Sequence, residues 1–447
     1  MSLSNADTIS MLVALILLLG CAHLSGDLAV RLRQPRVAGE IVGGLLLGPT
    51  VLGLALPVVQ RSVFHDSAAT SWMLGAIYQL GLFLLMFCSG AALRSSTRRG
   101  ERRATVLIAI VGNVLPFGAG LLFARLVDTG GLAGPAQNRT AFVLVLACGL
   151  AVTSIPVISK IMADLGILAT SFARIVLAVA VIEDVLLYVV VSVALGMVAP
   201  QHGDPFTLPG LLSIRPGSVA GNVYYVVASV AFFSLPLLLG RSFLDRLASH
   251  PGNVLHRSSP LAFAVVFLLT LTALALFIGV AAYFGAFVAG ILAGELRGRS
   301  AEAHDVVRRF SFAFFIPIYF AIVGLRLDLI RQFDVAFFLL FLGYACVIKA
   351  VSVYAGARLA GMAGQGARNL AVALNARGGP AIVLASVAYD ARIISQRFTI
   401  ALVMLALVTS AIAGSWLDIA LRRGVALDGA AAGDRTPAEE AATVRTG

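Results

Sequence analysis

Hydrophobic residues occur along this chain in long runs that are separated by short polar stretches. A run of about 20 apolar residues is long enough to cross the hydrocarbon core of a bilayer as an α-helix. Thirteen such segments can be recognised, at residues 10–30, 37–56, 72–93, 104–126, 140–162, 172–199, 220–240, 260–279, 281–296, 310–327, 334–360, 369–389 and 398–421. The pattern predicts an all-α polytopic membrane protein with about 13 transmembrane helices.

The division of residues 260–296 into two helices needs its own argument. One continuous helix over this range would be about 55 Å long at about 1.5 Å per residue, far more than one crossing requires. We therefore expect two passes that turn near Gly279.

The composition agrees with a membrane protein. Hydrophobic residues make up 59% of the chain, charged residues only 12%, and the mean hydropathy is +0.95, which lies outside the range of soluble domains. We expect one transmembrane domain over residues 1–423. The remaining residues, 424–447, contain many Ala, Gly and Glu residues and are expected to form a disordered cytoplasmic tail.

The basic residues predict how the chain is oriented. Most of the 33 Lys and Arg residues fall in alternate loops, starting with the loop after the first segment. Positively charged loops stay in the cytoplasm, so the N-terminus is predicted outside and the C-terminus inside, with the chain in the inner (plasma) membrane. The net charge of +11 then reflects membrane topology, and no nucleic-acid partner is expected.

Motifs of soluble enzymes are missing from the sequence. Neither lysine follows a glycine as a P-loop requires, and GQGARN at Gly364 has Asn369 where GxGxxG needs its last glycine. HExxH and GxSxG do not occur, and the six histidines and four cysteines lack metal-ligand spacing. We therefore expect no enzyme activity and no cofactor.

Four ionisable residues fall at membrane depth, namely Glu183, Asp184, Lys349 and Arg377. The acids lie about 13 Å of helix beyond Arg174, close to the middle of a core about 30 Å thick. Adjacent helical residues point about 100° apart, so one acid can face a helix while the other faces a cavity. Lys349 is the natural counter-charge, and Arg377 is the competing one. A purely structural ion pair is the alternative, but charge inside a membrane usually serves function.

Two of the predicted segments contain residues that interrupt a helix. These are Thr153, Ser154 and Pro156 in LAVTSIPVISK, and Gly378, Gly379 and Pro380 in LNARGGPAIVL. Such breaks free backbone groups, which must then line a wet or protein-buried site. The segments are the fifth and the twelfth, each the middle of a triplet, and this arrangement is typical of an inverted-repeat transporter. Ordinary proline kinks are the alternative.

Several stretches resemble one family, the monovalent cation:proton antiporters of the sodium/hydrogen exchanger fold, in its Kef-like and NapA-like branch. The stretches are PRVAGEIVGGLLLGPTVLG (35–53), LGLFLLMFCSG (80–90), TSIPVISKIMADLGIL (153–168), AVAVIEDVLLYVVV (178–191), GAFVAGILAGE (285–295) and LNARGG (374–379). The resemblance implies thirteen helices in a dimerisation domain and a six-helix core, a homodimer, and a role in pH homeostasis. The core would move sodium or potassium ions and protons by alternating access.

The resemblance also implies roles for individual residues. Asp184 would bind the monovalent cation or the proton, and Glu183 would pair with Lys349. Thr153 and Ser154 would lie beside the ion on the first broken helix. The branch usually has two aspartates, whereas the first acid here is Glu183, which leaves open whether exchange moves net charge.

Other classes of membrane protein fit the sequence less well. A cation-coupled solute symporter on a related inverted-repeat fold is the alternative, but few polar side chains at depth suggest a solute pocket. An intramembrane aspartyl protease has its two aspartates on separate helices and a GxGD motif, whereas the acids here are adjacent. A channel has no need for an acid that binds protons.

Overall fold

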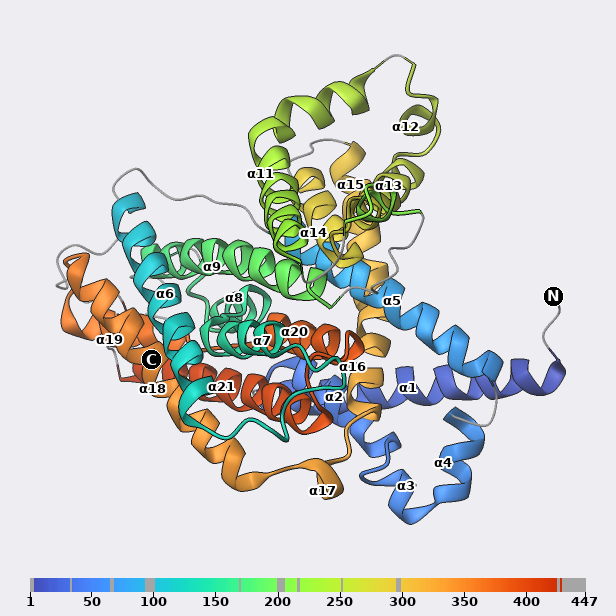
Figure 1. The fold of residues 1–447 in the computed structure, drawn as a ribbon, viewed down its shortest axis with the longest axis horizontal. Helices are drawn as coiled ribbons and strands as arrows, with labels where there is room; N and C mark the ends of the chain where they lie inside the picture. The colour runs from blue at the N-terminus through green and yellow to red at the C-terminus, as the bar shows by residue number, and fades with distance from the viewer. Residues whose placement is uncertain are drawn as a thin grey trace. The chain divides into compact units, whose positions relative to one another are not determined.

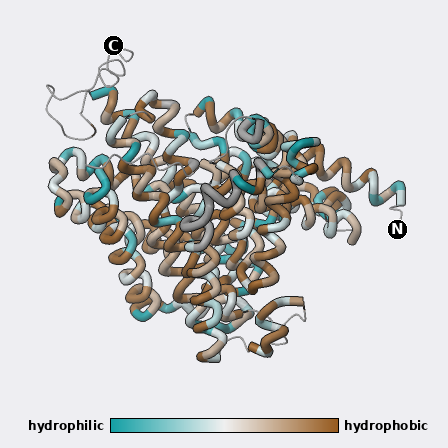
Figure 2. The backbone as a smooth tube through the Cα atoms, turned by 90° about the horizontal axis from the view of Figure 1, so that it is seen from above, coloured by the Kyte–Doolittle hydropathy of each residue, from teal (hydrophilic) through white to brown (hydrophobic). Residues whose placement is uncertain are grey.

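A computed structural model describes residues 4–32, 34–64, 68–92, 101–168, 170–198, 206–214, 218–250, 252–294, 299–423 and 427 (Figure 1). In this part of the chain ten helices are long and apolar enough to cross a membrane, and three shorter apolar helices accompany them. Together they coincide with the thirteen predicted segments, so the all-α polytopic fold is confirmed. Hydrophobic residues run along most of their length (Figure 2). The predicted tail at 424–447 lies outside the described residues, apart from Leu427.

The chain divides into two compact units, each built from separate stretches of sequence. The first unit takes residues 1–32, 36–94 and 199–331. Its helices are α1 (Asn5–Arg31), α2 (Arg36–Leu47), α3 (Leu52–Ala55), α4 (Pro57–Phe64), α5 (Ala68–Ala91), α10 (Leu208–Leu211), α11 (Val219–Ser249), α12 (Val254–Ser258), α13 (Pro260–Ile278), α14 (Ala282–Ala293), α15 (Arg299–Phe310), the π-helical turn η1 (Ser311–Phe315), α16 (Ile316–Leu325) and α17 (Leu329–Gln332).

Glycines set the helix packing in the first unit. A Cβ atom on Gly44 of α2 would lie 1.8 Å from the carbonyl oxygen of Ala321 in α16, and one on Gly324 would lie 2.0 Å from that of Ile41. A Cβ atom on Gly290 of α14 would lie 2.0 Å from the carbonyl oxygen of Phe87 in α5. Lipid tails are as apolar as the side chains, so no hydrophobic effect drives membrane helices together. They associate largely through such close backbone contact.

Proline explains the π-helical turn between α15 and α16. Pro317, in the first turn of α16, has no N–H and cannot donate to the carbonyl of Ala313 four residues earlier. The imidazole of His23 on α1 lies 2.9 Å from that carbonyl through Nε2, and the guanidinium of Arg36 lies 2.6 Å from its Nδ1. A side chain from another helix therefore takes the place of the missing amide.

Two boundaries in the first unit can be compared with the sequence. The predicted turn near Gly279 is confirmed, because α13 ends at Ile278 and Gly279 has φ +87° in the left-handed region. The predicted single helix at 37–56 is divided instead into α2 and α3. Pro49 cannot donate a backbone hydrogen bond, and Thr50 turns its hydroxyl to the carbonyl of Leu327 at 2.7 Å.

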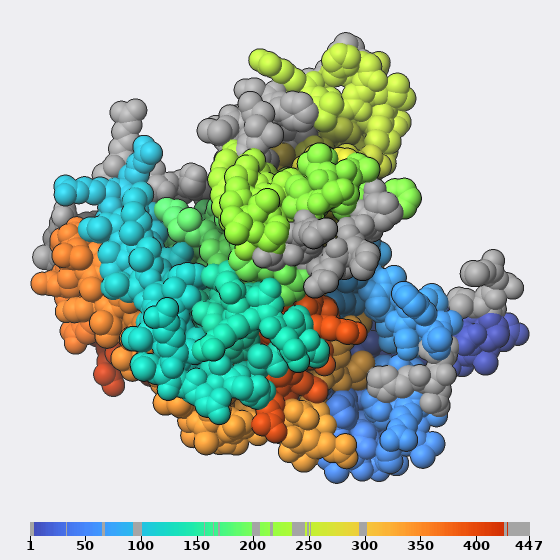
Figure 3. Space-filling view, viewed as in Figure 1, coloured from blue at the N-terminus to red at the C-terminus, as the bar shows by residue number. Residues whose placement is uncertain are grey.

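The second unit takes residues 33–35, 95–198 and 332–447. Its helices are α6 (Arg102–Leu126), α7 (Arg139–Ala151), α8 (Ile155–Asp164), α9 (Ser171–Gly196), α18 (Val335–Leu359), α19 (Gly364–Ala373), α20 (Gly378–Asp390) and α21 (Gln396–Arg422). The predicted breaks are confirmed, since α7 gives way to α8 and α19 to α20. In the view of Figure 1, α7, α8 and α20 lie between α9 and α21, and α19 lies beside α18. The helix α6 and the segment after it form part of the unit's surface (Figure 3).

We expect the stability of the first unit to depend on the close contact at Gly44. A methyl group there would collide with the backbone of α16, and backbone cannot move aside as a flexible side chain can. Gly44→Ala should therefore lower the melting temperature of the purified protein in detergent by several degrees. Gly75→Ala on α5 is the matched control, because a Cβ atom at that position meets nothing within 4 Å. Equal melting temperatures for the two variants would contradict this account.

Candidate ion-binding site

The two helix breaks of the second unit lie against each other. The hydroxyl of Thr153 donates to the carbonyl of Leu374 at 2.7 Å, and the backbone N–H of Ser154 donates to the carbonyl of Ala376 at 2.7 Å. Gly378 has φ +37°, and a Cβ atom on it would lie 2.6 Å from the Ser154 hydroxyl oxygen. Each break thus supplies partners for backbone groups that the other leaves free.

Two buried cations pair with the carbonyls at the end of α7. In a continuous helix the N–H of Ser154 would bond to the carbonyl of Leu150, but here it is turned to the other break. The guanidinium of Arg377 donates to the Leu150 carbonyl at 3.1 Å instead, and Lys349 donates to the Ala151 carbonyl at 2.6 Å. Positive charge at a helix C-terminus also complements the helix dipole.

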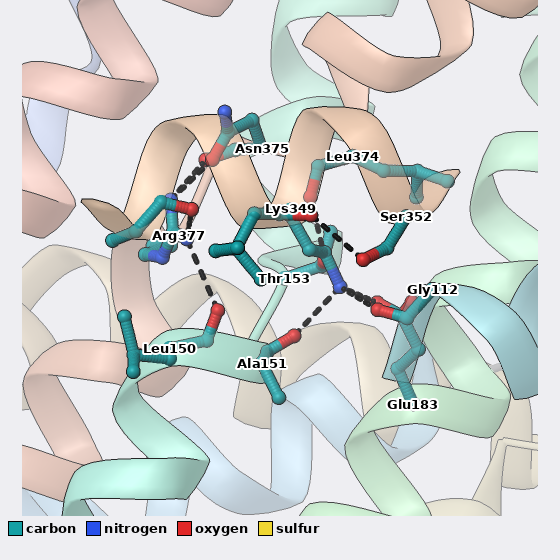
Figure 4. Close-up of polar contacts among 12 residues, drawn as sticks. Gly112, Leu150, Ala151, Thr153, Glu183, Lys349, Ser352, Leu374, Asn375 and Arg377 are labelled. Carbon is teal, nitrogen blue, oxygen red and sulfur yellow. Dashed lines mark hydrogen bonds and ion pairs between the residues drawn. The ribbon is translucent and has the colours of Figure 1, made fainter. Parts of the chain in front are cut away.

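Lys349 of α18 makes three hydrogen bonds through Nζ (Figure 4). Besides Ala151, the ammonium group donates to the carbonyl of Gly112 at 3.0 Å and to Glu183 Oε2 at 2.9 Å. The Gly112 carbonyl on α6 is available because Pro116, four residues later, has no N–H to offer it. Lys349 and Glu183 are both fully buried, so this is an ion pair shielded from solvent.

Asp184, the neighbour of Glu183 on α9, is 3% exposed. Its Oδ1 atom is buried and has no hydrogen-bonding partner in the described part of the chain. A buried carboxylate oxygen without a donor is costly, and a bound proton or cation would relieve that cost. Asp184 is therefore the group in this cluster with free capacity for an ion. Oε1 of Glu183 likewise has no hydrogen-bonding partner among the described residues, but its carboxylate already has a counter-charge in Lys349.

The other predicted site residues have structural partners at the breaks. The guanidinium of Arg377 donates hydrogen bonds to backbone carbonyls, including that of Ala345 at 2.9 Å. It forms no ion pair with an acid among the described residues. The Ser154 hydroxyl accepts from the N–H of Val157 at 3.4 Å and caps α8. Pro156 lies in the first turn of α8, and α20 begins with Gly378, Gly379 and Pro380. Among the residues that the structure describes, no hydrogen bond joins the Asp184 side chain to Thr153 or Ser154.

Two residues of the cluster were not anticipated from the sequence. Gly112 provides a carbonyl for Lys349, and a Cβ atom on it would lie 3.1 Å from Glu183 Oε1. Asn375 accepts from Arg377 through both its backbone and side-chain oxygens, and its Nδ2 donates to the Cys346 carbonyl at 3.1 Å. Pro116 was the signal for Gly112, because a proline within an apolar helix frees the carbonyl four residues earlier.

Comparisons with known proteins identify relatives over most of the chain. Residues 12–423 match the family described as sodium/hydrogen exchanger, transmembrane. The chain is 26% identical to the Na(+)/H(+) antiporter NhaS4 of Synechocystis over 91% of its length and 96% of that protein. It is 24% identical to the Na(+)/H(+)-K(+) antiporter GerN of Bacillus cereus, over 90% and 93% of the two chains.

A longer relative and a solved structure complete the comparison. The K(+)/H(+) antiporter 1 of Saccharomyces cerevisiae is 27% identical over 91% of this chain, which covers 46% of the yeast protein. The solved structure of the sodium proton antiporter MjNhaP1 from Methanocaldococcus jannaschii matches with a TM-score of 0.60 at 16% identity, over 92% of this chain and 98% of that one. It has the same fold. The family match spans nearly the whole membrane region, and the chain belongs to the sodium/hydrogen exchanger family of membrane transporters.

Proposed function

We propose that this chain exchanges a monovalent cation, sodium or potassium, for protons across a membrane by alternating access. Its relatives carry the names of Na(+)/H(+) and K(+)/H(+) antiporters. The observation that carries the proposal is the free Oδ1 atom of Asp184, buried next to a Glu183 that is already paired. One carboxylate that can hold either a proton or a cation is what competitive exchange requires.

The proposed mechanism follows from electrostatics. An ionised Asp184 without a bound ion is a buried charge, so the second unit would change its side of access only after a proton or cation has neutralised it. Thr153 and Ser154, on the broken helix, are proposed to supply further oxygen ligands when the ion is bound. Because both ions use the same carboxylate, each must leave before the other enters, and their transport is coupled.

Some features of the protein rest on the sequence alone and stay predictions. The distribution of basic residues supports a plasma-membrane protein with its N-terminus outside and its C-terminus in the cytoplasm. The homodimer and the Kef-like or NapA-like branch follow only from the resemblance of the quoted motifs. We propose them together with the exchange function.

The role of Asp184 can be tested with Asp184→Asn. The amide keeps the shape of the side chain but cannot ionise, so we expect exchange of lithium, sodium, potassium and rubidium to be abolished in proteoliposomes with an internal pH dye. Asp128→Asn is the control, because Asp128 is exposed in a loop and an amide oxygen can still accept from the N–H of Gly130. Cation-driven proton flux in a folded Asp184→Asn protein would refute the assignment.

The Glu183–Lys349 pair can be tested by a double-mutant cycle of thermal stability. Removing one charge leaves the other buried and unpaired, so Lys349→Ala should lower the free energy of unfolding by about 3 to 5 kcal/mol. Replacing both residues by Gln should recover much of that loss. The exposed pair Arg422–Asp418 is the control and should show little coupling. If the effects at Glu183 and Lys349 simply add, the pair does not stabilise the protein.

The contact between the two breaks can be tested with neighbouring glycines. Gly378 combines a positive φ with a Cβ position 2.3 Å from Val157 Cγ2, whereas a Cβ atom on Gly379 meets nothing within 4 Å. We expect Gly378→Ala to reduce both the exchange rate and the melting temperature, and Gly379→Ala to behave like the unmodified protein. Normal exchange by Gly378→Ala would show that transport does not depend on the close approach of the breaks.

A further inference from the structure

The charge moved in one transport cycle depends on how many buried groups exchange a proton for a cation. Among the described residues of the second unit, the buried acidic and basic side chains are Glu183, Asp184, Lys349 and Arg377. Arginine stays protonated in proteins. The question is therefore whether Lys349 and Glu183 release or take up protons together with Asp184.

The hydrogen bonds of Lys349 require its charged form. An ammonium group has three N–H donors, and three oxygens accept from Nζ, those of Gly112, Ala151 and Glu183, at 3.0, 2.6 and 2.9 Å. A neutral amine has only two N–H groups, and its lone pair would face the third oxygen. Loss of the proton would therefore leave one buried oxygen unpaired and would also remove the counter-charge of Glu183.

Two of these three partners belong to the fold and not to the ion site. The Gly112 carbonyl is free because of Pro116, and the Ala151 carbonyl is free because α7 ends there. Both need a donor whether or not an ion is bound. Arg377 donates to the carbonyls of Leu150 and Ala345 in the same way. Both buried cations of this unit therefore hydrogen-bond to backbone carbonyls.

We propose that Lys349 and Glu183 remain ionised throughout the cycle and that Asp184 alone alternates between one proton and one monovalent cation. Exchange is then one for one and moves no net charge. This inference rests on the proposed exchange function and adds its stoichiometry. Lys349 acts as a positioning residue that holds α6, the end of α7 and Glu183 together.

The charges balance in every step of this cycle. Ionised Asp184 binds one cation on one side of the membrane, so the carboxylate and its cation together carry no net charge. The loaded unit then opens its site to the other side. The cation leaves on the other side, one proton binds to the same carboxylate, and the unit returns with the same total charge. The Glu183–Lys349 pair contributes one negative and one positive charge in both directions.

The test measures the proton gradient at which net exchange by the unmodified protein stops. Proteoliposomes receive a fixed tenfold gradient of sodium or potassium, whichever supports exchange, and the external pH is varied until an internal dye reports no net proton movement. A gradient of the permeant anion thiocyanate then sets different membrane potentials without adding a competing cation. We expect balance when protons are also tenfold more concentrated on the side that holds more of the cation, and we expect the same balance point at every potential.

The possible outcomes separate the inference from the function on which it rests. A balance point that does not move with potential supports one-for-one exchange. A balance reached at a smaller proton gradient that moves with potential overturns it, because more than one proton then accompanies each cation, while the exchange function stands. Absence of any cation-dependent proton flux overturns both.

Proton release on ion binding gives a second measurement that does not depend on transport. Saturating sodium or potassium is added to the purified protein in weakly buffered detergent, and the protons released per chain are counted from the pH change. The unmodified protein and Asp128→Asn should release at most one proton per chain, and Asp184→Asn should release none. Release of two protons per chain would overturn the inference, because a second group would then have to give up a proton.

Discussion

The second unit depends on one constraint, which is that a backbone polar group inside a membrane must find a partner within the protein. The two helix breaks and Pro116 leave several carbonyls without the amides that a regular helix would supply. Lys349 and Arg377 take over those carbonyls, and the hydroxyl of Thr153 and the N–H of Ser154 take over two more. The buried positive charges are thus explained first by the irregular backbone.

The same constraint separates the roles of the two adjacent acids. A buried ammonium group needs a counter-charge, which Glu183 provides. Asp184 follows it on α9 and points elsewhere by about 100°, as helix geometry requires. Its Oδ1 atom has no hydrogen-bonding partner among the described residues. One acid pairs with the buried lysine, and the other keeps the oxygen on which the proposed exchange depends.

Much of this arrangement could be predicted from the sequence. Apolar runs located the thirteen segments, and Pro and Gly within two of them located the breaks, because both signals are local. The charges at depth singled out Glu183, Asp184, Lys349 and Arg377 for the same reason. The partners of Arg377 could not be predicted, since three of its acceptors are carbonyls of Leu150, Ala345 and Asn375, and every residue type carries a carbonyl. The close approach of Gly44 and Ala321 likewise depends on helices far apart in sequence.

The bonds of Lys349 also bear on the order in which the protein can fold. Gly112, Ala151 and Glu183 all precede Lys349 by more than 150 residues of sequence. A ribosome adds about 5 to 20 residues per second, so α6, α7 and α9 emerge well before the residue that pairs with them. During that interval a buried glutamate and two carbonyls lack their donor. The first half of this unit therefore completes its polar interior only once α18 has been made, which favours late and cooperative assembly over stepwise folding in order of synthesis.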